Sequence, residues 1–112
     1  MSEEIEKERS EIPEPEPVLL DGVRYAAIPW GKARGLGQNG GILAAQDPGS
    51  GAELWTLKVY QIDYDDEREG DKQDVFIESL HPQDDGTLQV VSERGDIYIV
   101  DPARRSASLH HA

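Results

Sequence analysis

The residues most able to do chemistry lie in one glycine-rich segment, PWGKARGLGQNGG, from Pro29 to Gly41. Within it, Gly35, Gly37 and Gly40 reproduce the G-x-G-x-x-G spacing of dinucleotide-binding loops. In such loops the glycines let the backbone approach a pyrophosphate, and a helix that begins directly after them supplies amide donors and a favourable dipole. The chemistry in question is therefore the binding of a phosphate-bearing cofactor.

The elements predicted around this segment do not suit that chemistry. The residues after Gly41 read ILAAQD, an apolar run that predicts a strand where the fingerprint needs a helix. The acidic residue that should hold a ribose, Glu53, lies on the next predicted strand, beyond a tight turn. Lys32 precedes the glycines and is followed by alanine, so a Walker-type loop does not fit either. We interpret the dinucleotide match as accidental.

What remains is a glycine-rich loop with polar, basic and aromatic side chains. Its candidate ligand-binding or partner-binding residues are Trp30, Lys32, Arg34, Gln38 and Asn39. Glycine turns beside polar side chains can form an anion-binding nest, and the i, i+2 spacing of the two basic residues would let them reach one carboxylate or phosphate in an extended segment. The alternative interpretation is a long flexible connection between strands.

The acidic segment from Asp63 to Asp74 invites a calcium interpretation. Asp65, Glu67 and Glu69 match the first, third and fifth positions of an EF-hand loop, but Phe76 stands where the bidentate glutamate should be. The flanking segments are also predicted strands, whereas the motif needs helices. The sequence therefore predicts a solvated acidic loop, with weak, nonspecific cation binding as the alternative.

The sequence contains no pattern typical of a metal site or of a catalytic nucleophile. The chain has no cysteine, and its three histidines, His81, His110 and His111, lack the spacing of ligands on a shared element. The serines stand in no nucleophile elbow, and no base is placed beside a nucleophile at the level of sequence. We predict no metal site, no cofactor and no catalytic residue, and the question of enzymatic activity stays open.

Composition and charge narrow the partner classes. Acidic residues outnumber Lys and Arg by 23 to 11, which gives a formal net charge of −12. Binding to nucleic acid or to anionic lipid depends on basic residues that neutralise phosphates, so we expect neither partner. No apolar run is long enough for a signal peptide or a membrane span, and we expect a cytoplasmic protein.

Apolar residues follow a period of two in short segments separated by turn residues such as DPGSG, QDDG and ERGD. This pattern predicts strands at Val23 to Ile28, Gly41 to Asp47, Glu53 to Ile62, Asp74 to Leu80, Thr87 to Ser92, Asp96 to Asp101 and, as a seventh, Ser106 to His110. In the third of these, Trp55, Leu57 and Val59 share one face and other apolar residues share the opposite one, so we expect a central strand with Trp55 in the core.

The predicted fold class is all-β: a single antiparallel meander of six to seven strands that forms a partly open barrel or sandwich. A disordered acidic tail, rich in proline and glutamate, is expected at residues 1–17, because Pro13, Pro15 and Pro17 alternate with acidic residues after a charged run. The β-domain then covers residues 18–112.

One hairpin, AAQDPGSGAELW, resembles the repeat of quinoprotein-type β-propellers. The matching positions are Ala45, Asp47, Ser50, Gly51 and Trp55. The resemblance implies a strand, a turn and a strand, with side-chain hydrogen bonds in the turn, a positive φ at the glycine and the tryptophan packed back on the hairpin. A second, degraded echo is IYIVDPARRSASL, in which Arg105 replaces the glycine and Leu109 the tryptophan.

A closed propeller needs at least four blades of four strands, and the predicted strands suffice for fewer than two. Because the quinone site of such enzymes is built by the whole propeller, the resemblance carries no cofactor residue to this chain. From about Val23 onward, the chain also resembles a family of small uncharacterised bacterial proteins that share segments like PWGKARGL, ELWTLKVY and DVFI. That resemblance implies no activity.

Two function hypotheses follow from the residues. The first is a small soluble, non-enzymatic binding or protein-interaction module that uses the Trp30 to Asn39 loop, an open sheet edge or self-association. The second is a small accessory enzyme or carrier that binds an anionic small molecule at the same loop. Convergence of Trp30, Lys32 and Arg34 on one concave pocket would favour the second hypothesis, and a flat or edge location would favour the first.

Overall fold

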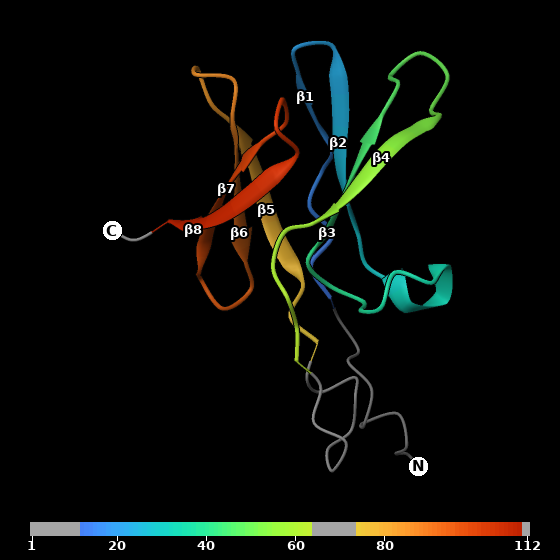
Figure 1. The fold of residues 1–112 in the computed structure, drawn as a ribbon, viewed down its shortest axis with the longest axis vertical. Helices are drawn as coiled ribbons and strands as arrows, with labels where there is room; N and C mark the ends of the chain where they lie inside the picture. Colours follow the sequence, from blue (N-terminus) through green and yellow to red (C-terminus); the bar gives the residue numbers. More distant parts are fainter. Residues whose placement is uncertain (1–11, 64–73, 111–112) are drawn as a thin grey trace.

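The computed structural model describes residues 12–63 and 74–110, and these form eight strands in two four-stranded antiparallel sheets (Figure 1). The first sheet has the order β1 (Val18–Leu20), β2 (Val23–Ile28), β3 (Ile42–Gln46) and β4 (Glu53–Lys58). The second has the order β5 (Ile77–Pro82), β6 (Leu88–Ser92), β7 (Ile97–Asp101) and β8 (Ser106–His110). The predicted all-β antiparallel class is confirmed.

Each sheet is a meander, because every strand pairs with its neighbour in sequence. The turn between β1 and β2 shows why these residues form hairpins: Asp21 and Gly22 both have positive φ, 51° and 81°. That backbone twist matches the twist of the paired strands, and Asp-Gly is among the dipeptides that adopt it most readily.

Among residues 12–63 and 74–110, the structure has no helix with the length and apolar composition needed to cross a membrane.

The turn between β3 and β4 has the hydrogen bonds expected for its sequence. Asp47 accepts from the amide of Gly49 at 3.2 Å and from the Ser50 hydroxyl at 2.9 Å, and that hydroxyl accepts from the amide of Ala52 at 3.1 Å. Gly51 has a φ of 79° and donates its N–H to the Asp47 carbonyl at 2.7 Å. The hydrogen bond from Ser50 and that from the Gly49 amide lower the pKa of Asp47.

The echo of this hairpin between β7 and β8 keeps part of the turn chemistry. Asp101 accepts from the amide of Ala103 at 3.1 Å, and Arg105, at the glycine position, has a positive φ of 53°. The guanidinium carbon of Arg105 lies 5.0 Å from the ring centroid of Trp55, a cation–π contact that joins this turn to β4. The propeller resemblance itself stays a prediction.

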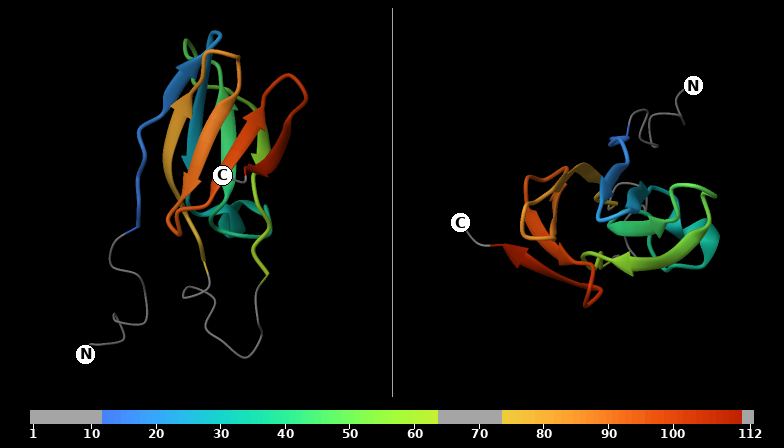
Figure 2. Two further views of the ribbon diagram at one scale, coloured as in Figure 1. Left: turned by 90° about the vertical axis from the view of Figure 1, so that its left-hand side faces the viewer. Right: turned by 90° about the horizontal axis from the view of Figure 1, so that it is seen from above.

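The hydrophobic core lies between the two sheets and takes side chains from both. It consists of Tyr25, Leu43, Ala45, Val59, Ile77, Leu80, Leu88, Val90 and Val100. In the view from above in Figure 2, the two sheets curve around a common centre, with β1 beside β5 on one side. On the other side Tyr60, just after β4, stacks on Tyr98 of β7, with ring centroids 4.9 Å apart. Neither sheet closes into a barrel.

Three details of the predicted strands are wrong. β1 was not expected, because its three residues come directly after the proline-rich segment. With β1, the described residues form eight strands in two four-stranded sheets, where six to seven strands were predicted. The segment Glu53 to Ile62 is not a central strand: it pairs only as far as Lys58 and lies at the edge of its sheet. The strand with both faces buried is β3. The segment Asp74 to Leu80 pairs only from Ile77 onward.

The early end of β4 has a local cause. The N–H of Val59 still donates to the carbonyl of Gly41 at 2.7 Å, in register with β3, but Ile62 then donates to the Gln38 side chain at 3.0 Å and no longer to a strand. Trp55 packs against the margin of the core, with its ring 6.0 Å from that of Tyr25, and it is only partly buried. Edge strands leave one side of such a residue open to solvent or to a covering side chain, which is Arg105 in this fold.

Candidate functional site

The glycine-rich loop between β2 and β3 is folded on one face of the first sheet. Its first part is a 3-10 helix, η1 (Gly31–Arg34), which ends at Gly35 with a φ of 79°. Leu36 then packs against a small second cluster of Ile28, Ile42 and Ala44, on the side of the sheet that faces away from the main core. The loop is therefore held by its own apolar contact.

The glycines of the loop serve close packing. A Cβ atom added at Gly40 would collide with the backbone carbonyl of Val75, and one added at Gly31 would collide with the carbonyl of Gln38. Gly41 combines a φ of 75° with the ring of Tyr60, which would lie 2.7 Å from such a Cβ atom. The loop leads into β3 and not into a helix, so no helix N-terminus is available for a pyrophosphate.

Gln38 lies in the interior of the protein, with no exposed surface. Its amide nitrogen donates to the carbonyls of Gly40 and Tyr60, both at 2.8 Å, and its amide oxygen accepts from the N–H of Ile62 at 3.0 Å. Buried polar groups of this kind are costly unless satisfied, and here both ends of the amide are. Gln38 therefore joins the loop to the segment after β4, whereas the sequence analysis placed it among the candidate ligand-binding residues.

Tyr60 ties the same region to the start of the second sheet. Its hydroxyl donates to the carbonyl of Val75 at 2.7 Å. The pKa of this hydroxyl is raised, mainly by burial and to a smaller extent by the charges that Tyr98 and Glu93 can carry nearby. Together, Gln38 and Tyr60 hold Ile62 and Val75, the two sides of the acidic segment. The predicted cation-binding residues of that segment, Asp65 to Glu69, lie outside the described residues.

The two basic residues of the loop do not act together on an extended segment, because they lie in a 3-10 helix. At three residues per turn, side chains two positions apart point in different directions. Arg34 is engaged by Glu53, whose two carboxylate oxygens lie 2.6 and 2.7 Å from Nη2, and this hydrogen bond raises the pKa of Arg34. Asn39 accepts from the backbone N–H of Lys32 at 3.1 Å and donates to Asp74 at 3.1 Å.

Trp30 is the loop residue that stands out toward solvent. Its exposed fraction is 51%, and its ring meets the ring of Phe76 edge to face, with centroids 5.7 Å apart. Phe76 is itself fixed: its N–H donates to the Glu93 carboxylate at 2.9 Å and its carbonyl accepts from the Glu93 N–H at 2.9 Å. A large aromatic side chain is thus held on a rigid base and left half exposed.

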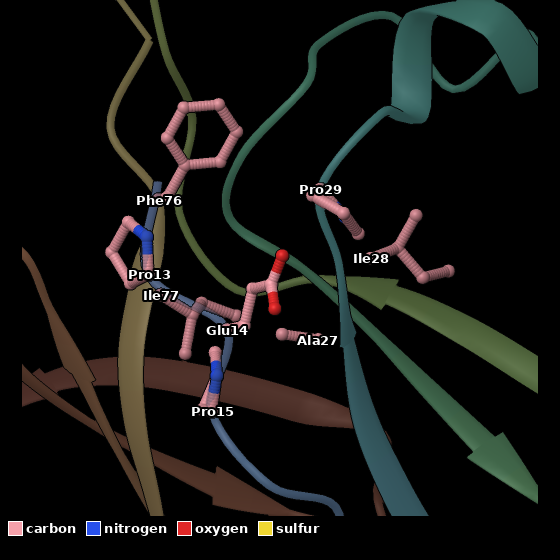
Figure 3. A pocket seen from close by; sticks show the side chains of 8 residues that line it. All are labelled: Pro13, Glu14, Pro15, Ala27, Ile28, Pro29, Phe76 and Ile77. Carbon is pink, nitrogen blue, oxygen red and sulfur yellow. The ribbon is translucent and has the colours of Figure 1, made fainter. Parts of the chain in front are cut away.

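A pocket of about 160 Å³ lies next to this aromatic pair, at the seam between the end of β2 and the start of β5 (Figure 3). Its lining residues are Pro13, Glu14, Pro15, Ala27, Ile28, Pro29, Phe76 and Ile77. The first three belong to the segment before β1, and the others lie in β2 and β5 or directly beside them in the chain. Trp30 follows Pro29 directly and contacts Phe76, so it stands beside this pocket.

Within residues 12–63 and 74–110, no group of three or more His, Asp or Glu side chains is placed to hold a metal ion. None of the candidate residues Trp30, Lys32, Arg34, Gln38 and Asn39 is among those that line the pocket at the seam. The sequence analysis missed the pocket residues, although the alternation of proline and glutamate from Pro13 to Pro17 was a usable signal, because it repeats with the period of an extended segment on a surface.

Comparison with known proteins adds no relative: no family model, no curated protein and no solved structure matches this chain.

Proposed function

We propose that this protein is a non-enzymatic protein-interaction module that contacts its partner through Trp30 and the apolar pocket beside it. The observation that carries the proposal is the half-exposed Trp30 ring, supported edge-on by Phe76. Tryptophan is enriched among the few residues that dominate binding energy in interfaces, since it brings a large apolar area with little conformational entropy to lose.

The loop's polar residues support this hypothesis over an anion carrier. Gln38 is buried, and Arg34 already has a carboxylate partner in Glu53. An anionic ligand at Arg34 would have to replace that carboxylate, which removes the main reason to expect a phosphate or carboxylate ligand at the loop. The exclusion of nucleic acid and membrane partners, and a cytoplasmic location, remain predictions that rest on charge and composition.

The test compares two variants of exposed apolar residues in the full chain. Trp30→Ala removes the proposed contact, and Leu109→Ala removes an exposed side chain of similar accessibility, 45%, on β8 of the other sheet. Chemical crosslinking in lysate of the source cells, followed by affinity purification and mass spectrometry, should recover a partner with the wild type and with Leu109→Ala but not with Trp30→Ala.

Thermal unfolding of both variants provides the control for folding. Because both side chains are about half exposed, we expect both variants to unfold cooperatively near the wild-type temperature. Equal recovery of the same partner by a folded Trp30→Ala variant would show that the interaction surface lies elsewhere.

A further inference from the structure

The segment before β1 is held on the seam by its prolines. Pro13 and Pro15 are partly buried, whereas Glu14 and Glu16, at the positions that follow them, are exposed. Proline has no N–H to give to a strand ladder, and residues 12–17 make no hydrogen bond to the described part of the chain. The segment is therefore held by side-chain packing alone, unlike β1, which follows it and pairs with β2.

The surface under this segment belongs to the two sheets. We call it the seam groove and define it by Ala27, Ile28 and Pro29 on one side and Phe76 and Ile77 on the other. Ile28 and Ile77 lie in paired strands, and the backbone of Phe76 is fixed by Glu93. The backbone on both sides of the groove is thus held by strand pairing and by Glu93, and the side chains that it presents are mainly apolar (Figure 3).

The segment fills the seam groove incompletely. The pocket of about 160 Å³ between them exceeds the volume of a water molecule, about 30 Å³, several times over. Packing at such a site gains less dispersion energy than a close-packed contact. Trp30, whose ring contacts Phe76 at the edge of the groove, also stays 51% exposed with the segment in place.

From these contacts we infer that the seam groove binds an extended Pro-x-Pro segment of a partner protein, and that Pro13 to Pro15 of this chain is the intramolecular competitor for the same surface. This inference rests on the proposed interaction function and names its partner class. Proline-rich segments suit apolar, aromatic-lined grooves because they are already extended and lose little entropy on binding.

The burial pattern also predicts what the seam groove would recognise. Pro13 and Pro15 are partly buried against the groove, and Glu14 between them is more exposed, although its side chain also lines the pocket (Figure 3). Binding should therefore require the prolines, and replacement of the residue between them should have a smaller effect. Because a tethered competitor acts at an effective concentration of about millimolar, a partner would bind the wild type more weakly than a chain whose own prolines are removed.

The experiment uses the full chain and three fluorescein-labelled peptides. The first has the sequence of residues 12–18, IPEPEPV; the second replaces its glutamates by serine; the third replaces its prolines by alanine. Fluorescence anisotropy measures their affinity for the wild type and for the double variant Pro13→Ser, Pro15→Ser. We expect the double variant to bind the first two peptides at least about tenfold more tightly than the wild type does, and the third peptide not to bind.

Two further variants act as controls. Pro48→Ser changes an exposed proline in the turn after β3 and should bind like the wild type. Addition of Trp30→Ala to the double variant should weaken peptide binding by about tenfold or more, since Trp30 is the exposed ring next to the seam groove. Circular dichroism on heating checks that each variant folds. With isotopically labelled wild type, excess first peptide should shift the Trp30 indole resonance, a measurement that needs no variant.

The outcomes separate the two proposals. Equal affinity of the wild type and the double variant, or equal binding of the alanine peptide, would overturn the inference. An unmoved Trp30 resonance in the wild type at millimolar peptide would do so as well. If the peptides fail while a crosslinked partner is still lost in Trp30→Ala, the interaction function stands and its Pro-x-Pro partner class is wrong.

Discussion

Removal of the Gln38 side chain should be among the most damaging polar changes that this fold can undergo. Its amide is fully buried and makes three hydrogen bonds of 2.8 to 3.0 Å, to Gly40, Tyr60 and Ile62. In Gln38→Ala the amide of Ile62 and the two carbonyls lose that partner. Each lost hydrogen bond is worth about 1 kcal/mol net, and more where a buried group is left unsatisfied. The expected loss of unfolding free energy is about 3 to 4 kcal/mol.

The loss should be easy to measure. Domains of this size have total stabilities of about 5 to 15 kcal/mol, so the change is a large share of the whole. In urea titrations followed by tryptophan fluorescence, the midpoint should fall with little change in slope, and the melting temperature should fall by about 12 °C or more. The matched control is Gln61→Ala: Gln61 is exposed and bonds only Lys58 and the carbonyl of Ile62, so its loss should stay within about 0.5 kcal/mol.

A second substitution at the same position tests the cause. In Gln38→Glu the new carboxylate would face the carbonyls of Gly40 and Tyr60, which accept hydrogen bonds and cannot donate them. Burial and these carbonyls raise the pKa of the introduced group in the folded state. A carboxyl group whose pKa is higher in the folded than in the unfolded state contributes to the free energy of unfolding below its unfolded pKa, about 4.3. That contribution is lost as the pH rises through the pKa of the folded state. The deficit of Gln38→Glu relative to wild type should therefore shrink on acidification. A Gln38→Ala variant as stable as Gln61→Ala would refute the reasoning.

Four other changes have defined outcomes. Gly40→Ala should destabilise by about 2 kcal/mol or more in urea unfolding, because its methyl group would meet the carbonyl of Val75. Tyr60→Phe should lose about 1 kcal/mol with its hydrogen bond; since burial raises the folded pKa of Tyr60, wild-type stability should also fall above pH about 10, and the variant's stability should fall less. Trp55→Ala should lose about 3 kcal/mol, at the lower end for a core tryptophan, because its ring lies at the margin of the core. Arg34→Ala should leave the urea midpoint unchanged, as its ion pair is exposed.

The strands were predictable where the period of two is enforced by one buried face. β2, β3 and β5 to β8 were located by alternation and by turn residues, because the side chains of a strand alternate between its faces. The prediction failed where the pattern continues but the backbone partners change. The alternation of ELWTLKVYQI runs on to Ile62, yet beyond Val59 the backbone leaves the sheet and Ile62 bonds the Gln38 side chain.

The candidate site was harder to predict for a physical reason. The role of Gln38 depends on Tyr60 and Ile62, more than twenty positions away in sequence, and no local pattern reports such a contact. The signal that was available is the glycines around Gln38, which indicate that another part of the backbone approaches closely. Trp30 was among the candidate residues predicted from the sequence, and its exposed fraction of 51% leaves its ring accessible to a partner.

The hydrogen bond that Gln38 accepts from Ile62 and the one that Tyr60 donates to Val75 should also make the domain tolerant of insertion at one place. They attach the backbone at Ile62 to the Gln38 side chain and the backbone at Val75 to the Tyr60 side chain, so the folded domain itself holds both ends of the connection. Lengthening a connection between fixed ends costs only about 0.6 kcal/mol for each doubling. An affinity tag inserted between these two residues should therefore leave the strand pairing unchanged.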